Sequence, residues 1–268
     1  MKTVSRQRPV FRLANQDILF EDSDLLVVNK PAGLLSVPIP GSRAQNLLDL
    51  LNTSLAGPGR RVGTVHRIDR YTSGAVVFSK NRTAQVHLVR QFREHTALRF
   101  YLAIVRGRVG PQEGELRHHL MLTAHGFRQV VVKSDKEGAT PAVSHFRVLE
   151  RMPDATLLEA QLVTGLKNQL RVQFRAAGHP VVGDRHYEPS EKEKASLDRQ
   201  ALHAHRLGFV HPRTARPVEF TAPPPPDFVR LLRELRGQTS SEAPSPRTRP
   251  RTPGGVSGAR RGRPRRPQ

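Results

Sequence analysis

The chain has 268 residues, of which 44 are Lys or Arg and 23 are Asp or Glu, so its formal net charge is +21 at pH 7. A charge this far from zero indicates a polyanionic partner. Cysteine is absent, which excludes a disulfide framework and a thiolate metal site. No stretch has the length and apolar character of a membrane span or a signal peptide, so we expect a soluble, cytoplasmic protein.

Apolar periodicity and turn residues predict the elements in chain order. Two short strands are expected between residues 18 and 30, across an acidic turn. Further strands are expected at residues 74–79, 100–105, 116–122, 130–132, 143–149, 157–163, 202–210 and 218–220. Helices are expected at residues 47–55 and 82–94, from Thr164-Gly165 through Ala177, and at 228–235 with Asp227 as its cap. Runs of strands with interspersed helices favour an α+β fold over doubly wound α/β.

Composition divides the chain into three parts. Residues 1–16 form a basic N-terminal lead, residues 17–236 the folded domain, and residues 237–268 a tail rich in Arg, Pro and Gly. The tail has too few apolar residues to offset the entropy of ordering, so we expect it to be disordered. Its eight Arg and one Glu would make it either a solubilising extension or an electrostatic RNA tether, and the sequence leaves both open.

The run Thr64-Val65-His66-Arg67-Ile68-Asp69-Arg70-Tyr71-Thr72-Ser73-Gly74 places one carboxylate among a histidine and two arginines, just before a short apolar strand. Asp69 therefore belongs to a loop that enters the core. Cationic neighbours favour the charged form of a carboxylate, so Asp69 is a candidate nucleophile or base. The alternative is an aspartate that only fixes a turn or pairs with a neighbouring arginine.

This run resembles the signature of the RluA family of RNA pseudouridine synthases. Four other segments resemble family motifs in the family's order, and together the five cover roughly residues 17–222. They are Asp24–Ser36, the Asp69 loop, Leu98–Gly107, Thr164–Asp184 and Leu202–Pro212. The resemblance implies a single catalytic domain built on a long mixed, mainly antiparallel sheet flanked by helices and loops.

The resemblance also implies roles for individual residues. Asp69 would be the catalytic aspartate, Tyr101 would lie against the flipped uracil and serve in proton transfer, and Arg171 would pair with Asp69. Arg67 would fill the space that the flipped base vacates. Further substrate-binding residues would be His66, Arg70, Thr72, Lys167, Asn168 and Gln169. The isomerisation needs no cofactor, and we expect no metal. Attack of Asp69 on the sugar, attack on the base and a glycal route all remain open.

Two features depart from the family pattern. After Thr164-Gly165 the chain has Leu166, Lys167 and Asn168 where many members carry Arg, then Ser or Thr, then His. If these residues were helical, Lys167 and Asn168 would share the face of Arg171. The small S4 RNA-binding module that commonly precedes the catalytic domain is expected to be missing, because about sixteen residues precede the first strand.

Other functions fit the sequence less well. The segment His66–Asp69 lacks the spacing of a kinase catalytic loop, and residues 57–63 form no phosphate-binding fingerprint. The twelve histidines show no metal-ligand motif. A non-catalytic RNA-binding or chaperone protein on the same fold is the main alternative, although such a protein would have been free to lose Asp69. We expect a monomer that acts on RNA, with 23S ribosomal RNA favoured and transfer RNA open.

Overall fold

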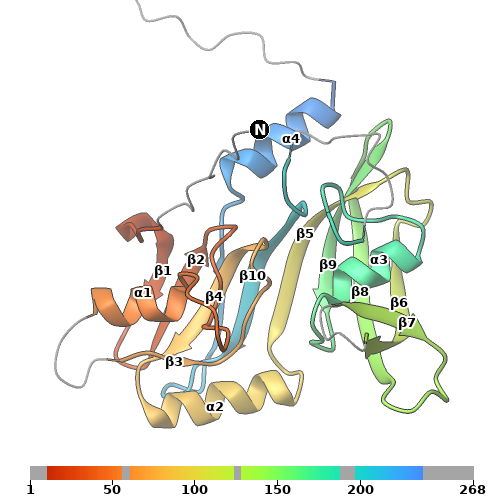
Figure 1. The fold of residues 1–268 in the computed structure, drawn as a ribbon. Coiled ribbons are helices and arrows are strands. Elements are labelled where there is room, and N and C mark those ends of the chain that lie inside the picture. Colours follow the sequence, from red (N-terminus) through yellow and green to blue (C-terminus); the bar gives the residue numbers. More distant parts are fainter. Residues whose placement is uncertain (1–10, 56–60, 124–127, 188–196, 238–268) are drawn as a thin grey trace, which may run out of the picture. The chain divides into compact units, whose positions relative to one another are not determined.

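The computed structural model describes residues 11–55, 61–123, 128–187 and 197–237 (Figure 1). All of these residues belong to the first of the chain's two units, Met1–Gln238. The expected disordered tail lies outside the described residues except for Gly237, and so does most of the N-terminal lead. Within the lead, Asn15–Asp17 form a short 3-10 helix that the sequence did not predict.

Eleven strands form one mixed sheet. They are β1 (Ile18–Glu21), β2 (Leu25–Lys30), β3 (Gly63–Thr64), β4 (Ser73–Ser79), β5 (Leu98–Arg106), β6 (Glu113–Leu122), β7 (Gln129–Val132), β8 (Thr140–Arg151), β9 (Ala155–Leu162), β10 (Leu202–Val210) and β11 (Pro217–Thr221). The order across the sheet is β1-β2-β4-β10-β5-β9-β8-β6-β7, with β3 paired to β4 and β11 to β10. Among the described strands only β4 and β10 pair in parallel, so the mainly antiparallel α+β fold is confirmed.

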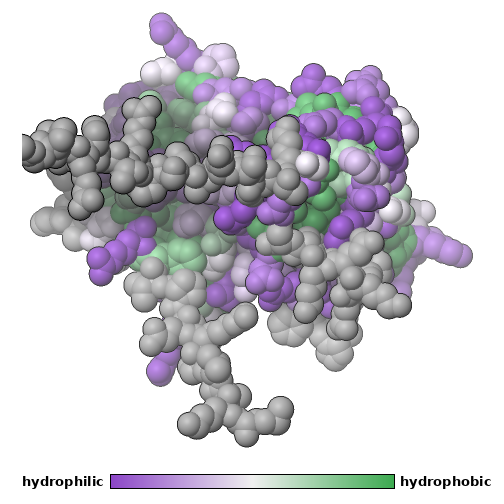
Figure 2. Space-filling model, turned by 90° about the horizontal axis from the view of Figure 1, so that it is seen from above, coloured by the Kyte–Doolittle hydropathy of each residue, from purple (hydrophilic) through white to green (hydrophobic). Residues whose placement is uncertain are grey.

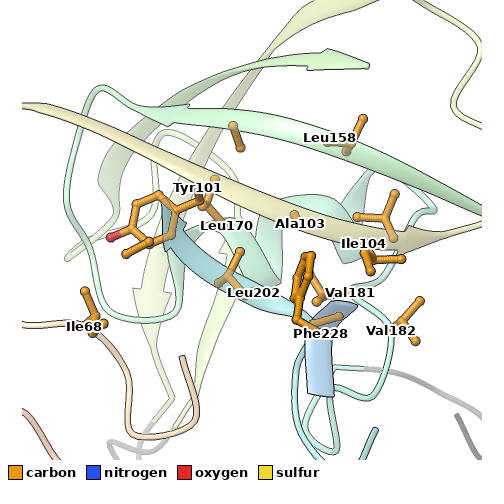
Figure 3. Packing of buried hydrophobic residues seen from close by; sticks show 14 of the residues in the cluster. Ile68, Tyr101, Ala103, Ile104, Leu158, Leu170, Val181, Val182, Leu202 and Phe228 are labelled. Carbon is orange, nitrogen blue, oxygen red and sulfur yellow. The ribbon is translucent and has the colours of Figure 1, made fainter. Parts of the chain in front are cut away.

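Both faces of the sheet are buried at β2 and β4, which explains their continuous apolar sequences. Successive side chains of a strand point to opposite faces. Leu26 and Val28 accordingly pack into one hydrophobic cluster, and Leu25 and Val27 into a second. The first, larger cluster contains side chains of β2, β4, β5, β9 and β10 and forms the main core (Figure 3). Hydrophilic residues cover much of the molecular surface that is seen from above in Figure 2.

Within the described residues, four α-helices cover the sheet: α1 (Leu47–Ser54), α2 (Arg82–Arg93), α3 (Gln169–Ala176) and α4 (Pro226–Leu235). Helices α1, α3 and α4 contribute side chains to the large cluster, whereas Leu88 of α2 packs into the second. At β2 and β4, helix α2 therefore covers the face opposite to the one that α1 covers. None of the helices among the described residues is both long and apolar enough to cross a bilayer.

Two predicted helix starts are wrong. Helix α3 begins at Gln169 rather than near Gly165, because Asn168 adopts a left-handed conformation with φ of 56°. Lys167 and Asn168 thus precede the helix and do not lie on its Arg171 face. Helix α4 begins at Pro226, so Asp227 lies inside its first turn and is not the cap; its carboxylate instead binds Arg199 at 2.7 and 2.8 Å.

The parallel contact between β4 and β10 needs a glycine and a neutral histidine. Gly74 has φ of +118°, and a Cβ there would lie 2.2 Å from the carbonyl oxygen of Ala204. Beside it, His203 Nε2 donates to the carbonyl of Ala222 at 3.0 Å, and Nδ1 accepts from the hydroxyl of Ser73 at 2.9 Å. Burial is the main cause that lowers the pKa of His203 to about 4.

The buried His203 makes stability depend on pH. Between pH 6.5, its ordinary pKa, and about 4, the unfolded chain binds a proton at this position and the folded chain does not. The free energy of unfolding should therefore fall as pH falls through this window, by up to about 1.4 kcal/mol per pH unit from this group. His203→Gln removes the group, so the stability difference between wild type and variant should shrink from pH 6.5 to 4. Urea unfolding of both proteins across this range measures it, and parallel pH curves would contradict the assignment.

Candidate active site

The loop between β3 and β4 carries Asp69, and the segment after β2 holds this loop in place. Lys30 is fully buried, and its Nζ donates to the carbonyls of Pro31, Leu34 and Arg70 at 2.9, 2.7 and 3.1 Å. Ser36 Oγ donates to the carbonyl of Ile68 at 2.9 Å. Gly33 and Arg70 exchange two further hydrogen bonds of 2.8 Å. The backbone on both sides of Asp69 is thus fixed before any ligand binds.

Arg171 of α3 reaches this loop and pairs with its carboxylate. Arg171 Nη1 donates to Asp69 Oδ2 at 3.1 Å, although the two residues are 102 positions apart in the chain. The Asp69 side chain is 21% exposed and that of Arg171 only 6%, so the carboxylate is accessible while its partner is buried behind it. The sequence-based expectation that Arg171 pairs with Asp69 agrees with this geometry.

Asp184 anchors Arg171, and the sequence analysis missed its role. Its side chain is fully buried and accepts from Arg171 Nε at 2.6 Å and Nη2 at 2.8 Å. Its Oδ1 also accepts the backbone N–H of His186 at 3.0 Å. Burial opposes the charged form of Arg171, but Asp184 and then Asp69 raise its pKa above the ordinary value. Asp184 follows the apolar pair Val181-Val182, but this local pattern does not show that the carboxylate meets Arg171.

Replacing Asp184 with asparagine should therefore damage both stability and catalysis. The change leaves a buried guanidinium without its bidentate partner, which we expect to lower the free energy of unfolding by about 3 kcal/mol or more. Arg171 would also lose the contact that aims Nη1 at Asp69, so kcat should fall about 10-fold or more at a temperature where the variant is folded. Asp198→Asn, in an exposed pair with Arg185, is the control and should change neither quantity. Equal effects of the two substitutions would contradict the anchoring role.

Tyr101 of β5 lies at the border between the core and the site. Its ring is 7% exposed and packs in the large cluster, while Figure 3 shows its hydroxyl oxygen pointing away from Ala103 and Ile104. Burial raises the pKa of Tyr101 to about 12; Arg99 opposes this shift and Asp69 adds to it. The hydroxyl therefore keeps its proton at neutral pH and is available as a donor.

A cavity of about 570 Å³ brings these groups together. Its wall contains four arginines and a single carboxylate, Asp69. The lining residues are Val65, His66, Arg67, Ile68, Asp69, Thr72, Val89, Phe92, Arg93, His95, Arg99, Tyr101, Leu162, Gly165, Leu166, Asn168, Gln169, Leu170, Arg171 and Leu202. They come from α2 and the turn after it, α3 and the turn before it, β5, β9, β10 and the Asp69 loop, so the site forms only when these distant segments are packed together.

Some of the binding residues predicted from the sequence line the cavity, and others do not. Arg67 is exposed, lines the cavity and has no hydrogen bond or ion pair within the described part of the chain. Thr72, Asn168, Gln169 and His66 also line the cavity. Arg70 and Lys167 do not: Arg70 Nε binds the carbonyl of Gly33, and Lys167 is exposed in the turn before α3.

Two of the cavity residues are largely occupied by contacts within the protein. His66 Nε2 accepts the backbone N–H of Val77 at 3.1 Å, and its ring stacks on Phe92 with centroids 4.2 Å apart. Burial first, and then Arg99, lowers the pKa of His66 to about 3, so the imidazole is neutral. Gln169 is 2% exposed, and its amide binds Thr164, Leu166, Val143 and Ser144. Both residues shape the wall of the cavity.

Asn168 contacts the Arg171–Asp69 pair directly. Its Oδ1 accepts from Arg171 Nη1 at 2.8 Å, the same nitrogen that donates to Asp69. Asparagine is one of the few residues other than glycine that adopts the left-handed conformation readily. The departure from the family pattern at this position is thus compatible with an intact Arg171–Asp69 pair.

Asp22, Asp24 and His211 form a group whose candidate ligand atoms lie within 4.8 Å of one another. These groups are already hydrogen-bonded within the protein. His211 Nε2 binds Asp22 at 2.8 Å, and Arg213 Nη2 binds Asp24 at 2.7 Å. The cluster therefore stabilises the turn between β1 and β2 and does not belong to the cavity.

Two solved human structures share this fold. RNA Pseudouridylate Synthase Domain Containing 4 superposes with a TM-score of 0.68 and 23% identity, over 82% of this chain and 93% of that chain. RNA Pseudouridylate Synthase Domain Containing 1 superposes with a TM-score of 0.66 and 26% identity, over 80% and 87%. The protein thus has the fold of the pseudouridylate synthase domains.

Sequence relatives give the same result. Residues 24–176 match the family model described as RNA pseudouridylate synthase. The uncharacterized RNA pseudouridine synthase YlyB of Bacillus subtilis is 41% identical over 225 residues, which cover 82% of this chain and 73% of that protein. Ribosomal large subunit pseudouridine synthase D of Neisseria meningitidis serogroup B is 39% identical over 231 residues, covering 82% and 61%. The chain belongs to the RluA-type RNA pseudouridine synthases, isomerases that convert uridine to pseudouridine in RNA.

Proposed function

We propose that this enzyme modifies uridines of 23S ribosomal RNA, with Asp69 as the reacting carboxylate and the target base flipped into the cavity. The observation that carries the proposal is the accessible Asp69 carboxylate, paired with buried Arg171 beside Tyr101 in one basic cavity. The name of the Neisseria relative refers to the large ribosomal subunit, which supports a ribosomal target over transfer RNA.

Base flipping follows from the depth at which the reacting groups lie. A uracil within a helix is stacked and paired, so its glycosidic bond can reach Asp69 only if the nucleotide leaves the stack. Arg67 is exposed at the cavity and unpaired within the described part of the chain, which suits a side chain that enters the vacated space. Tyr101 would then lie against the flipped ring and supply its hydroxyl to proton transfer at C5.

Arg171 would act on the reacting carboxylate and not on the RNA. Its Nη1 holds Asp69 Oδ2 at 3.1 Å and so fixes the orientation of the carboxylate. The pairing also leaves Asp69 Oδ1 without a hydrogen bond from the described residues, so one oxygen stays available for reaction. The same geometry serves attack on the sugar, attack on the base or a glycal route.

A map of pseudouridines across all RNAs tests the target. It would compare the parent strain, a strain that lacks the gene, and the latter complemented with wild type or with Asp69→Asn. We expect a 23S ribosomal uridine to lose its modification in the deletion strain and to regain it only with the wild-type gene. If the deletion strain loses pseudouridine only in transfer RNA, the substrate is transfer RNA and the ribosomal target is wrong. Restoration by Asp69→Asn would contradict the assigned role of Asp69 and favour a non-catalytic function in RNA folding.

We also propose that the enzyme acts as a monomer in the cytoplasm. The described part of the chain lines the cavity with its own residues. The proposed ribosomal target would place the enzyme in the cytoplasm. Light scattering of the purified protein, with and without RNA, would measure the oligomeric state. A stable dimer would overturn the first of these proposals.

A further inference from the structure

Arg99 is a second buried cation in the cavity wall, beside the catalytic pair. It lies two residues before Tyr101 on β5, so both side chains leave the strand on the same face. Arg99 is 8% exposed and lines the same cavity as Asp69 and Tyr101. The reaction as derived above gives this residue no role.

The guanidinium of Arg99 is only partly satisfied by the protein. Its Nη2 donates to the carbonyls of Leu162, Val163 and Thr164 at 3.4, 2.9 and 3.3 Å. Its Nε is buried without a partner, and its Nη1 makes no hydrogen bond to any described residue. No carboxylate of the described residues forms an ion pair with Arg99, and burial lowers its pKa. A buried cation without a counter-ion is costly, and a protein tolerates it where a ligand supplies the charge.

Gly165 leaves space in front of Nη1. A Cβ at this position would lie 2.5 Å from Arg99 Nη1, so any other residue would press on the guanidinium. Gly165 is exposed and lines the cavity, which makes Nη1 reachable across the glycine backbone. The ring of Phe92 lies 5.9 Å from the guanidinium carbon on another side.

We propose that Arg99 is a substrate-binding residue whose Nη1 donates to a phosphodiester oxygen next to the target uridine. Uracil and ribose are neutral, so the phosphodiesters are the groups of RNA that bring a negative charge to an unpaired cation. Arg93, exposed at the end of α2, also lines the cavity and adds positive charge near the entrance. This inference rests on the proposed entry of the uridine into the cavity. It implies that the site selects a nucleotide with its phosphate over a free nucleoside.

If Arg99 had only a structural role, it would need only Nη2, whose hydrogen bonds link β5 to the end of β9 and the turn after it. The test must therefore separate phosphate recognition from folding. Uridine, uridine 5′-monophosphate and uridine 3′-monophosphate serve as probes for the full-length protein at constant ionic strength, with binding followed by NMR. Because a hydrogen bond to a charged group is among the stronger ones, we expect at least one monophosphate to bind about 10-fold more tightly than uridine.

Arg99→Met should remove this preference and leave the affinity for uridine unchanged. Arg90→Met is the control, because Arg90 is exposed on α2 and does not line the cavity. It should keep the preference. Gly165→Ala provides a second variant if Arg99→Met does not fold, since it obstructs Nη1 without removing the charge. It should weaken binding of the monophosphate more than that of uridine.

Three results would overturn the proposal: equal affinities of wild type for uridine and both monophosphates, an unchanged preference in Arg99→Met, or a parallel loss of uridine and monophosphate binding in folded Arg99→Met and Gly165→Ala. None of these would affect the pseudouridine map of the deletion strain. Conversely, Asp69→Asn should keep the phosphate preference while it loses turnover, so failure of one proposal can be told apart from failure of the other.

Discussion

Asp69→Asn is expected to lower pseudouridine formation by at least about 10³-fold while the protein stays folded and binds RNA. Asparagine has nearly the shape of aspartate, and its carbonyl oxygen can still accept from Arg171 Nη1. Arg171 also keeps its two bonds to Asp184, so the buried ion pair survives the substitution. The variant therefore loses only the negative charge and nucleophilicity of one accessible carboxylate.

RNA binding should survive because phosphate contacts supply most of the affinity of such complexes. Single-turnover assays would measure the chemical step, and filter binding at several salt concentrations would measure affinity. Asp154→Asn, in the exposed turn between β8 and β9, is the matched control and should be fully active. Substantial turnover by purified Asp69→Asn would refute its assignment as the reacting group. A joint loss of turnover, affinity and melting temperature would point to a structural aspartate instead.

The strands of this fold were predictable because their apolar runs are strong local signals. Leu25–Val28 and Ala75–Phe78 read as buried strands, and both faces of β2 and β4 are indeed covered. The pairing of β4 with β10 was not predictable, because it joins residues about 130 positions apart through the glycine at position 74. The predicted start of α3 was too early because of a local backbone conformation. Its sequence has helical periodicity, but the left-handed Asn168 interrupts the backbone.

The pairing of Arg171 with Asp69 could be expected from the family resemblance, whereas the groups that hold this pair in place could not. The bidentate contact of Asp184 with Arg171 depends on how the loop after α3 folds back, which local sequence does not encode. Arg99 and Lys30 gave a weaker signal, since each is a charged residue within or at the end of an apolar strand. Their depth of burial, and for Arg99 the missing counter-ion, emerge only when the elements pack.

The structure also refines the expected substrate contacts. His66 and Gln169 use their polar atoms largely within the protein, so the residues best placed to meet RNA are those with unused groups at the cavity. Arg67 meets that description at the surface, and Arg99 does so inside. The local sequence does not separate Arg67 from His66 and Gln169, because it shows which residues are polar but not which partners they have in the fold.

Tyr101→Phe is expected to reduce turnover roughly 10²-fold with little change in stability. The ring packs in the main core, so phenylalanine keeps the apolar contacts and removes only the hydroxyl at the cavity. Because the pKa of Tyr101 is raised to about 12, the hydroxyl should stay protonated through the neutral range, and the wild-type rate should show no alkaline limb from this residue below about pH 11.

Tyr71→Phe is the matched control for Tyr101→Phe, since Tyr71 lies two residues after Asp69 but is 43% exposed and does not line the cavity. It should retain wild-type turnover. Single-turnover rates from pH 6 to 11, together with melting temperatures, distinguish the two roles that Tyr101 could have. A near-wild-type rate for Tyr101→Phe would remove its hydroxyl from the chemical step and leave the ring as a surface for the flipped uracil. A large fall in melting temperature would instead assign the hydroxyl to the fold, because a proton-transfer group at a cavity contributes little to packing.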